Sequence, residues 1–209
     1  FVFSIFHHDG FSMYNTNTKV KKRLVHTGSD AGEIVDCDLH YSIMETPYKR
    51  DVVKEIVDAG RRKGLGIGLY YSHIDWFDSD FRIDKHNYQY DSSYTKESDP
   101  KGFQRMIARH RNQLREICSK YGKLDLLSLD MGFPGEEEKH KYGTGCEHGI
   151  KKDLIKTVKM IRDIQPDVLI RQRGIAQYGD YHTPERVVPE DNKTALNEDK
   201  PWQVMYQGS

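Results

Sequence analysis

Short apolar runs alternate with longer amphipathic stretches along this chain. Four leucines among residues 124–130 (LDLLSLD) form an apolar run too short for a helix, which is typical of a strand buried on both faces in a parallel sheet. The runs at 1–6 (FVFSIF), 65–72 (LGIGLYYS) and 167–173 predict three further strands, and residues 204–206 predict a short last one.

Between these strands, the apolar positions recur with the period of a helix. A first helix is expected to begin at Thr46-Pro47, where a capping hydroxyl precedes a proline, and to end at Gly64. Two more are expected from Asp99 to Gly122 and over residues 150–164. Strand and helix therefore alternate, which predicts a parallel sheet with right-handed crossovers.

The fold expected from this alternation is a (β/α)8 barrel of the TIM type. No G-x-G-x-x-G or P-loop motif is present, and polar residues follow nearly every strand, so the barrel is preferred to a doubly wound sheet. The 209 residues fall short of the roughly 250 of a full barrel, so we expect an incomplete fragment lacking the first and last strands. The whole of 1–209 is interpreted as one catalytic barrel domain, with long loop insertions at about 17–45 and 77–99.

Asp130 is the last residue of the 124–130 strand. A carboxylate there stands at the carboxyl edge of the sheet, where barrel enzymes place their chemistry, although an aspartate in this position can also cap the next turn. Tyr70 and Trp76 lie at and just after the end of the preceding strand, so we expect them at the same edge of the sheet.

His7 and His8 follow the first strand. Neighbouring side chains on a strand point to opposite faces, so the two imidazoles are not expected to share a metal ion, which favours hydrogen bonding or sugar binding. A metal-dependent hydrolase using His7, His8 and His73 stays open as a rival interpretation.

Composition narrows the range of partners. Lysine plus arginine equals aspartate plus glutamate at 32 each, so no global field favours nucleic acid or an anionic membrane. No apolar run approaches the length of a membrane span. Thirteen tyrosines, eight phenylalanines and two tryptophans offer flat amphipathic surfaces that suit sugar faces. The three cysteines show no C-x-x-C spacing, which argues against a disulfide framework or a zinc ribbon.

Five short motifs, in order along the chain, together resemble the α-L-fucosidases of glycoside hydrolase family 29. They are HHDGF at 7–11, TPYKRD at 46–51, GLYYS at 68–72, LDMG at 129–132 and DYHTPE at 180–185. The resemblance implies a retaining exo-glycosidase that needs no metal or cofactor and releases terminal α-L-fucose from oligosaccharides or glycoconjugates. Such enzymes are commonly secreted, periplasmic or lysosomal, and the resemblance leaves the oligomeric state open.

The same resemblance assigns roles to individual residues. Asp130 would attack the anomeric carbon, and Glu185, in a Thr-Pro-Glu motif, would serve as acid and base at a carboxyl separation of about 5 to 5.5 Å. Sugar-binding positions are also implied: His7, His8 and Tyr70 for the fucose hydroxyls, Arg173 for the sugar and Trp76 for the wall of the pocket.

Two positions depart from the family pattern. Trp202-Gln203 stands where some members carry an acid/base in a Trp-Glu pair, and Arg171-Gln172-Arg173 stands where members often carry Asn-Asp-Arg. The glutamine motivates an alternative function, a catalytically impaired barrel that binds a fucose- or galactose-type sugar. A related glycosidase of different sugar specificity is the other alternative.

Overall fold

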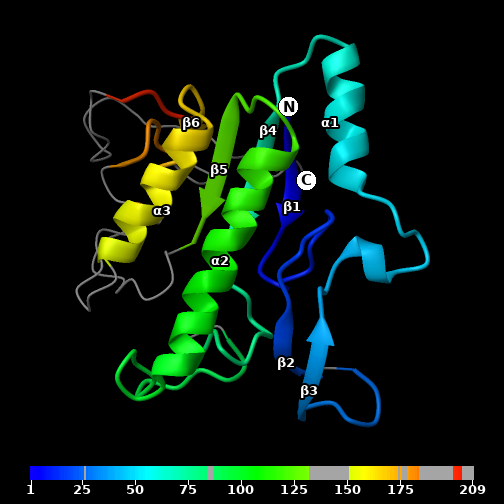
Figure 1. Ribbon diagram of the computed structural model, residues 1–209, viewed down its shortest axis with the longest axis vertical. Coiled ribbons are helices and arrows are strands. Elements are labelled where there is room, and N and C mark those ends of the chain that lie inside the picture. The colour runs from blue at the N-terminus through cyan, green and yellow to red at the C-terminus, as the bar shows by residue number, and fades with distance from the viewer. Residues whose placement is uncertain are drawn as a thin grey trace.

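The computed structural model describes residues 1–25, 27–83, 87–131, 151–173, 175, 178–183 and 200–203. Four strands form one parallel sheet in the order β1-β4-β5-β6, and three helices accompany it (Figure 1). The strands of this sheet are β1 (Val2–Phe6), β4 (Gly68–Ser72), β5 (Leu126–Asp130) and β6 (Leu169–Ile170). The helices are α1 (Val52–Arg62), α2 (Pro100–Lys120) and α3 (Lys151–Ile164).

The sheet is the portion of a (β/α)8 barrel that the sequence predicts. Each strand pairs in parallel with its neighbour, and the order of strands in space follows their order in the chain. Parallel neighbours need a crossover, and helices α1, α2 and α3 lie in those crossovers. α2 and α3 pack side by side in front of β5 (Figure 1).

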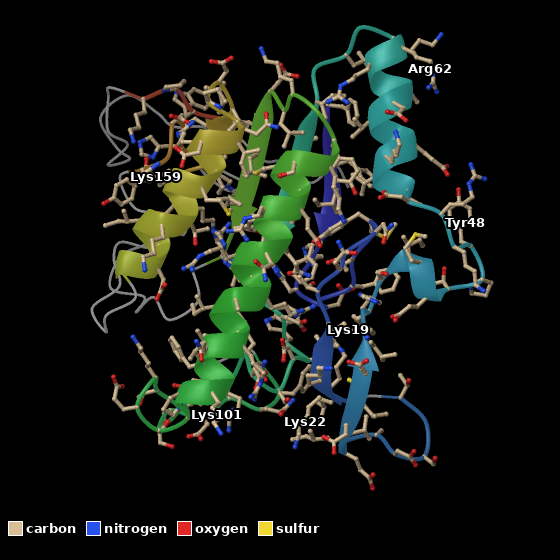
Figure 2. All side chains as sticks on the ribbon, viewed as in Figure 1. Lys19, Lys22, Tyr48, Arg62, Lys101 and Lys159 are labelled. Atoms are coloured by element: carbon tan, nitrogen blue, oxygen red, sulfur yellow. The ribbon has the colours of Figure 1, made fainter. Side chains whose placement is uncertain are left out.

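The core lies between the sheet and its helices. Every residue of β4 is buried, as are the last four of β5. Leu69 and Leu127 of these strands and Leu114 of α2 are completely inaccessible to solvent. Charged side chains such as Arg62, Lys101 and Lys159 stand on the outer faces of the helices (Figure 2). The amphipathic pattern therefore fixes which face of each helix meets the sheet.

The start of α2 is confirmed and the start of α1 is wrong. At α2 the Asp99 carboxylate accepts from the backbone N–H of Gly102, and Pro100 occupies the first turn. The first helix was expected at Thr46-Pro47 but begins at Val52, because Asp51 is the residue that caps it. Thr46 instead closes a short 3-10 turn, η1 (Ile43–Glu45), and Lys49 adopts a φ of 49°, which no helix accommodates.

The insertion at 17–45 contains an antiparallel hairpin that the sequence does not predict, formed by β2 (Val20–Leu24) and β3 (Ile34–Leu39). No residue of β3 is buried, although apolar and acidic residues alternate over 35–39 (VDCDL), a short signal that could have indicated a strand. The described residues of 77–99 form no helix or strand, whereas 204–206, where a last strand is predicted, lies outside the described residues.

Two other strands are shorter than predicted. β4 begins at Gly68, because Leu65 before it is half exposed and outside the ladder. β6 covers only Leu169–Ile170, continued by an isolated bridge between Arg171 and Tyr181. No helix among the described residues is long and apolar enough to cross a membrane.

Candidate active site

Asp130 ends β5 at the carboxyl edge of the sheet, as predicted, and four groups contact its carboxylate. Arg173 Nη1 lies 3.0 Å and Arg171 Nη1 3.4 Å from Oδ1, which also accepts from the Met131 backbone N–H at 2.9 Å. The Tyr70 hydroxyl donates to Oδ2. Asp130 thus caps its own turn through Met131 and also stands at the centre of a buried polar cluster.

The surroundings of Asp130 favour the ionised carboxylate. Burial alone would raise its pKa, but the positive charges of Arg171 and Arg173 and the hydrogen bond from Tyr70 outweigh this and lower it. Burial and the neighbouring carboxylate raise the pKa of Tyr70, so its hydroxyl remains a donor. The cluster therefore holds a negatively charged oxygen in a largely dry setting.

His7 and His8 lie beside this cluster. The His7 ring stacks on Tyr70 at 5.7 Å between centroids, and His8 Nδ1 is 2.7 Å from Ser72 Oγ. The rings of His8 and Trp76 are 4.9 Å apart. The structure thus brings together all the sugar-binding positions predicted at the ends of β1 and β4.

The expectation that the two histidines diverge is wrong. Their ring centroids are only 3.9 Å apart, because β1 ends at Phe6 and the following residues enter a turn, closed by a bond from Gly10 N to His7 O of 3.0 Å. Strand alternation does not apply there. Among the described residues, no group of three or more histidine, cysteine, aspartate or glutamate side chains is placed to hold a metal ion.

Arg171 is a candidate site residue that sequence reasoning did not single out. Its side chain is fully buried, and its Nε donates to Thr183 Oγ1. Arg171 and Arg173 are two residues apart, so on an extended backbone both point to the same face of the sheet. That spacing could have indicated that both guanidinium groups reach Asp130.

Glu185, which the resemblance assigns as acid and base, lies outside the described residues. The chain before Glu185 is described as far as Thr183, which is held by Arg171. Gln203 is also placed: its backbone N–H donates to His182 O at 2.8 Å, and Trp202 forms a parallel bridge with His182. The segment around Gln203 therefore lies directly beside the one that leads to Glu185.

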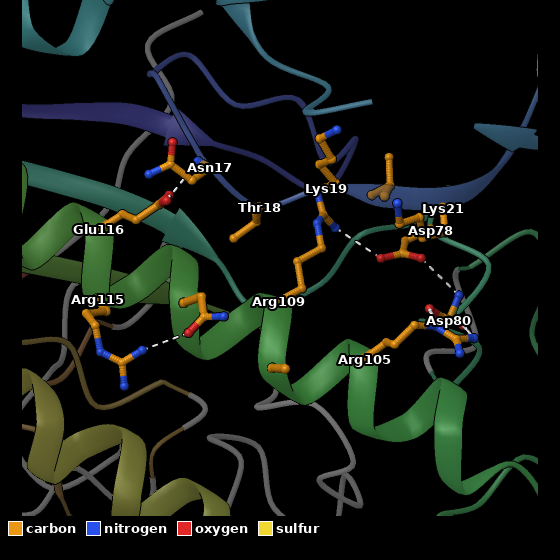
Figure 3. Close-up of a pocket in the computed structure, with 13 residues that line it drawn as sticks. Asn17, Thr18, Lys19, Lys21, Asp78, Asp80, Arg105, Arg109, Arg115 and Glu116 are labelled. Carbon is orange, nitrogen blue, oxygen red and sulfur yellow. Dashed lines mark hydrogen bonds and ion pairs between the residues drawn. The ribbon is translucent and has the colours of Figure 1, made fainter. Parts of the chain in front are cut away.

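A cavity of about 490 Å³ lies elsewhere, between α2 and residues 17–21 (Figure 3). None of its lining residues contacts Asp130. Arg105 binds Asp80 within its lining, and Lys19 binds Asp38 outside it. It is a separate feature of the hairpin side and not part of the Asp130 cluster.

The fold and this cluster define the class of (β/α)8-barrel proteins that carry a buried carboxylate at the carboxyl edge of the sheet. A model of the alpha-L-fucosidase family matches residues 1–207, so the chain belongs to the alpha-L-fucosidase family.

Individual proteins similar to this chain carry the same family name. A putative alpha-L-fucosidase of Caenorhabditis elegans is 30% identical over 77 residues, which are 37% of this chain and 12% of that protein. Alpha-L-fucosidase isoenzyme 1 from Paenibacillus thiaminolyticus is 29% identical with a TM-score of 0.66, covering 97% of this chain and 44% of its own. AlfC from Lactobacillus casei has the same fold, at 20% identity and a TM-score of 0.60, over 97% of this chain and 54% of its own. The chain thus spans about half the length of these structures or less.

Proposed function

We propose that this chain is the catalytic part of a retaining exo-α-L-fucosidase that acts on fucosylated oligosaccharides or glycoconjugates. The observation that carries the proposal is the ionised Asp130 carboxylate held by two arginines and a tyrosine, beside two histidines. The identity of the proposed sugar comes from relatives of the same fold. One structure of AlfC contains alpha-L-fucose product, and another contains Fuca(1,6)GlcNAc.

Asp130 Oδ2 is the oxygen proposed to attack the anomeric carbon. A carboxylate oxygen offers two lone pairs in the plane, and Oδ1 already meets Arg171, Arg173 and the Met131 N–H. Among the described residues Oδ2 accepts only from Tyr70, so it retains a lone pair for the sugar. Attack forms a glycosyl ester at Asp130 and breaks the bond to the leaving oxygen, which takes a proton from the acid.

Glu185 is proposed as that acid, and as the base that later activates water. Arg171 supports this placement because it contacts both Asp130 Oδ1 and Thr183 Oγ1, two residues before Glu185. Two residues of extended chain span at most about 7 Å, so the proposal requires the chain after Thr183 to run toward Asp130. A retaining mechanism requires the two carboxyl groups to be about 5 to 5.5 Å apart.

His7, His8, Trp76 and Arg173 are proposed to bind the sugar. The histidines offer ring nitrogens to hydroxyl groups, and Trp76, next to His8, offers a flat apolar face. The neutral balance of charge in the chain suits an uncharged sugar and gives no attraction for nucleic acid. Residues 1–209 are proposed to act as one catalytic domain, with the two insertions shaping access.

The test is removal of the nucleophile in the full-length protein. Asp130→Gly should fold, lose nearly all turnover of an aryl fucoside, and regain part of it when azide is added as an external nucleophile. Asp167→Gly, at an exposed aspartate, is the matched control and should keep wild-type turnover. Wild-type rates in Asp130→Gly would show that Asp130 is only a turn cap.

A second candidate function is a barrel that binds the sugar without hydrolysing it. Gln203 favours it, since its backbone pairs with the segment that leads to Glu185 and its side-chain amide cannot protonate a leaving group. Affinity of the wild-type protein for fucose without release of the aryl group would support this alternative.

A further inference from the structure

A buried arginine joins the hairpin insertion to the turn that carries both histidines. Arg23 lies on β2 and is 5% exposed, and its two terminal nitrogens bond three oxygens. Nη1 lies 3.0 Å from Asp75 Oδ2, while Nη2 lies 3.3 Å from Asp75 Oδ1 and 2.8 Å from the backbone oxygen of Asp9. One side chain thus binds both the loop after β4 and residues 7–10 (HHDG), which we call the histidine turn.

The histidine turn is fastened to the loop after β4 at two neighbouring residues. His8 O accepts from the Trp76 backbone N–H at 2.8 Å, and the next backbone oxygen, that of Asp9, accepts from Arg23. Asp75, which precedes Trp76, binds the same guanidinium group. The rings of His8 and Trp76, both proposed to meet the sugar, therefore lie on two segments that are joined once directly and once through Arg23.

The carboxylate that anchors Arg23 is itself fixed from several sides. Oδ1 of Asp75 also accepts from the backbone N–H groups of residues 77 and 78, at 2.9 and 3.1 Å. Gly10 of the histidine turn packs so closely against it that a Cβ there would lie 2.0 Å from Oδ2. Burial would raise the pKa of Asp75, but the positive charges of Arg23 and Arg109 outweigh this and lower it. The anchor is therefore ionised and held in place.

The shape of the guanidinium group matters at this position. Arg23 Cζ lies 3.7 Å from the centroid of the Tyr41 ring, near the end of the same insertion. A planar guanidinium group stacks on an aromatic ring and directs separate nitrogens at separate acceptors, whereas the ammonium group of lysine is a point charge on one nitrogen. The bonds to Asp75 and to Asp9 O therefore require an arginine.

We propose that Arg23 is a positioning residue for the sugar site, which sets the histidine turn against Trp76 through its bonds to Asp9 O and Asp75. Because Arg23 is buried, it acts through His8 and Trp76 and does not itself touch the sugar. The hairpin insertion then contributes to affinity for the sugar and not only to access. The inference rests on the proposed function, because it explains how two of the proposed sugar-binding residues are kept in place.

Arg109 of α2 offers a matched comparison within the same ionic cluster. Its Nη1 lies 3.0 Å from Asp75 Oδ2 and 3.1 Å from Asp78 Oδ2, and neither bond reaches the histidine turn. Since one nitrogen makes both bonds, the ammonium group of lysine can replace it. Arg23 uses two nitrogens for three oxygens, so lysine there keeps the charge but cannot bond both Asp75 and Asp9 O in the same way.

The experiment compares Arg23→Lys with Arg109→Lys in the full-length protein. We expect Arg23→Lys to raise both the KM for an aryl fucoside and the inhibition constant of free L-fucose about 10-fold, with kcat within about 3-fold of wild type. Arg109→Lys should leave all three values within about 2-fold of wild type. Wild-type KM and inhibition constant in Arg23→Lys, a loss confined to kcat, or equal rises in the two variants would overturn the proposal.

Backbone hydrogen exchange gives a measurement that does not depend on turnover. In the wild-type protein, the bond to His8 O should slow exchange of the Trp76 amide about 100-fold or more relative to an unfolded chain. Arg23→Lys should speed this exchange about 10-fold or more, and Arg109→Lys should not. Unprotected exchange of Trp76 in the wild-type protein would overturn the proposal even if Arg23→Lys does not fold. If the wild-type protein neither binds nor releases fucose while the exchange results are as expected, the proposed function fails and the link through Arg23 stands.

Discussion

The ion pair between Arg173 and Asp130 gives the sharpest test of how the nucleophile is kept ionised. Arg173 Nη1 is 3.0 Å from Asp130 Oδ1, and the two side chains are 31% and 12% exposed. A cation this close lowers the pKa of a carboxyl group by about 1 to 3 units. Because Arg173 is partly solvated and Arg171 remains at 3.4 Å, we expect Arg173→Gln to raise the pKa of Asp130 by about 1 unit, or roughly 1.4 kcal/mol.

The assay is the pH dependence of kcat/KM for an aryl fucoside, from about pH 3 to pH 8. The acidic limb of Arg173→Gln should move up by about 1 unit relative to wild type. Arg105→Gln is the matched control, since it also removes one positive charge from a carboxylate pair, here with Asp80 at 2.7 Å. An acidic limb that stays in place in Arg173→Gln, or that moves equally in Arg105→Gln, would refute the reasoning.

The same pKa shift has a consequence for stability. The folded-state pKa of Asp130 is lowered, so its ionised form stabilises the fold at pH values above the unfolded pKa of about 3.9. This contribution is lost as the pH falls through the folded value. The free energy of unfolding of Arg173→Gln should therefore approach that of wild type as the pH is lowered below about 4.

Three further predictions follow from the site and one from the turn beside it. Tyr70→Phe should lower kcat by about 10-fold, because Asp130 Oδ2 loses its donor; an effect on KM alone would place Tyr70 only on the sugar. Glu185→Ala should slow fucosides with poor leaving groups far more than aryl fucosides, and a uniform loss would contradict the role of acid. Dialysis against a chelator should leave turnover unchanged, and a loss restored by zinc would favour a metal. Gly10→Ala should lower the free energy of unfolding by about 2 kcal/mol or more. Gly10 has a φ of 73°, and a Cβ there would overlap the Asp75 carboxylate, so an unchanged melting temperature would contradict this prediction.

The sequence predicts those elements whose local signals agree with their burial. β4, β5 and α2 were located because they are apolar and bounded by clear stop or cap residues, such as Asp99 and the Gly122 that ends α2 with a φ of 68°. The hairpin of β2 and β3 is attached through few buried residues, among them Val20 and Arg23, whose Nη1 lies 3.0 Å from Asp75 Oδ2. In β2 (VKKRL) three consecutive charged residues interrupt any alternation, so that strand gives no periodic signal in the sequence.

The candidate site was predicted in part for the same reason. A carboxylate at the end of a buried strand can be recognised from the pattern alone, and Asp130 was found in this way. The partners of Asp130 depend on which side chains share its face of the sheet, and this requires the register of the strands. Glu185 depends on a segment that the structure does not describe, so its role stays a prediction.

Register also explains why residues from four strands converge. Tyr70 is paired with Ser128 and Ser72 with Asp130, so these four side chains share one face, and the small Ser128 leaves room for the Tyr70 ring. The pairing of Leu127 with Ile170 puts Arg171, the next residue, on that same face, and Arg173 reaches Asp130 Oδ1 from the turn that follows.

β1 would not present His7 to this face without its irregularity. Ser4 pairs with Tyr70, so an unbroken register would place Phe6 opposite Ser72 and His8 on the inner face. The shift between Ser4 and Phe6 pairs Phe6 with Tyr71 instead, and β1 ends there, so the turn after Phe6 brings His7 onto Tyr70 and His8 onto Ser72. One extra residue in β1, followed by a turn, thus brings both histidines beside the carboxylate cluster, and a bulge is known to re-aim side chains in this way next to active sites.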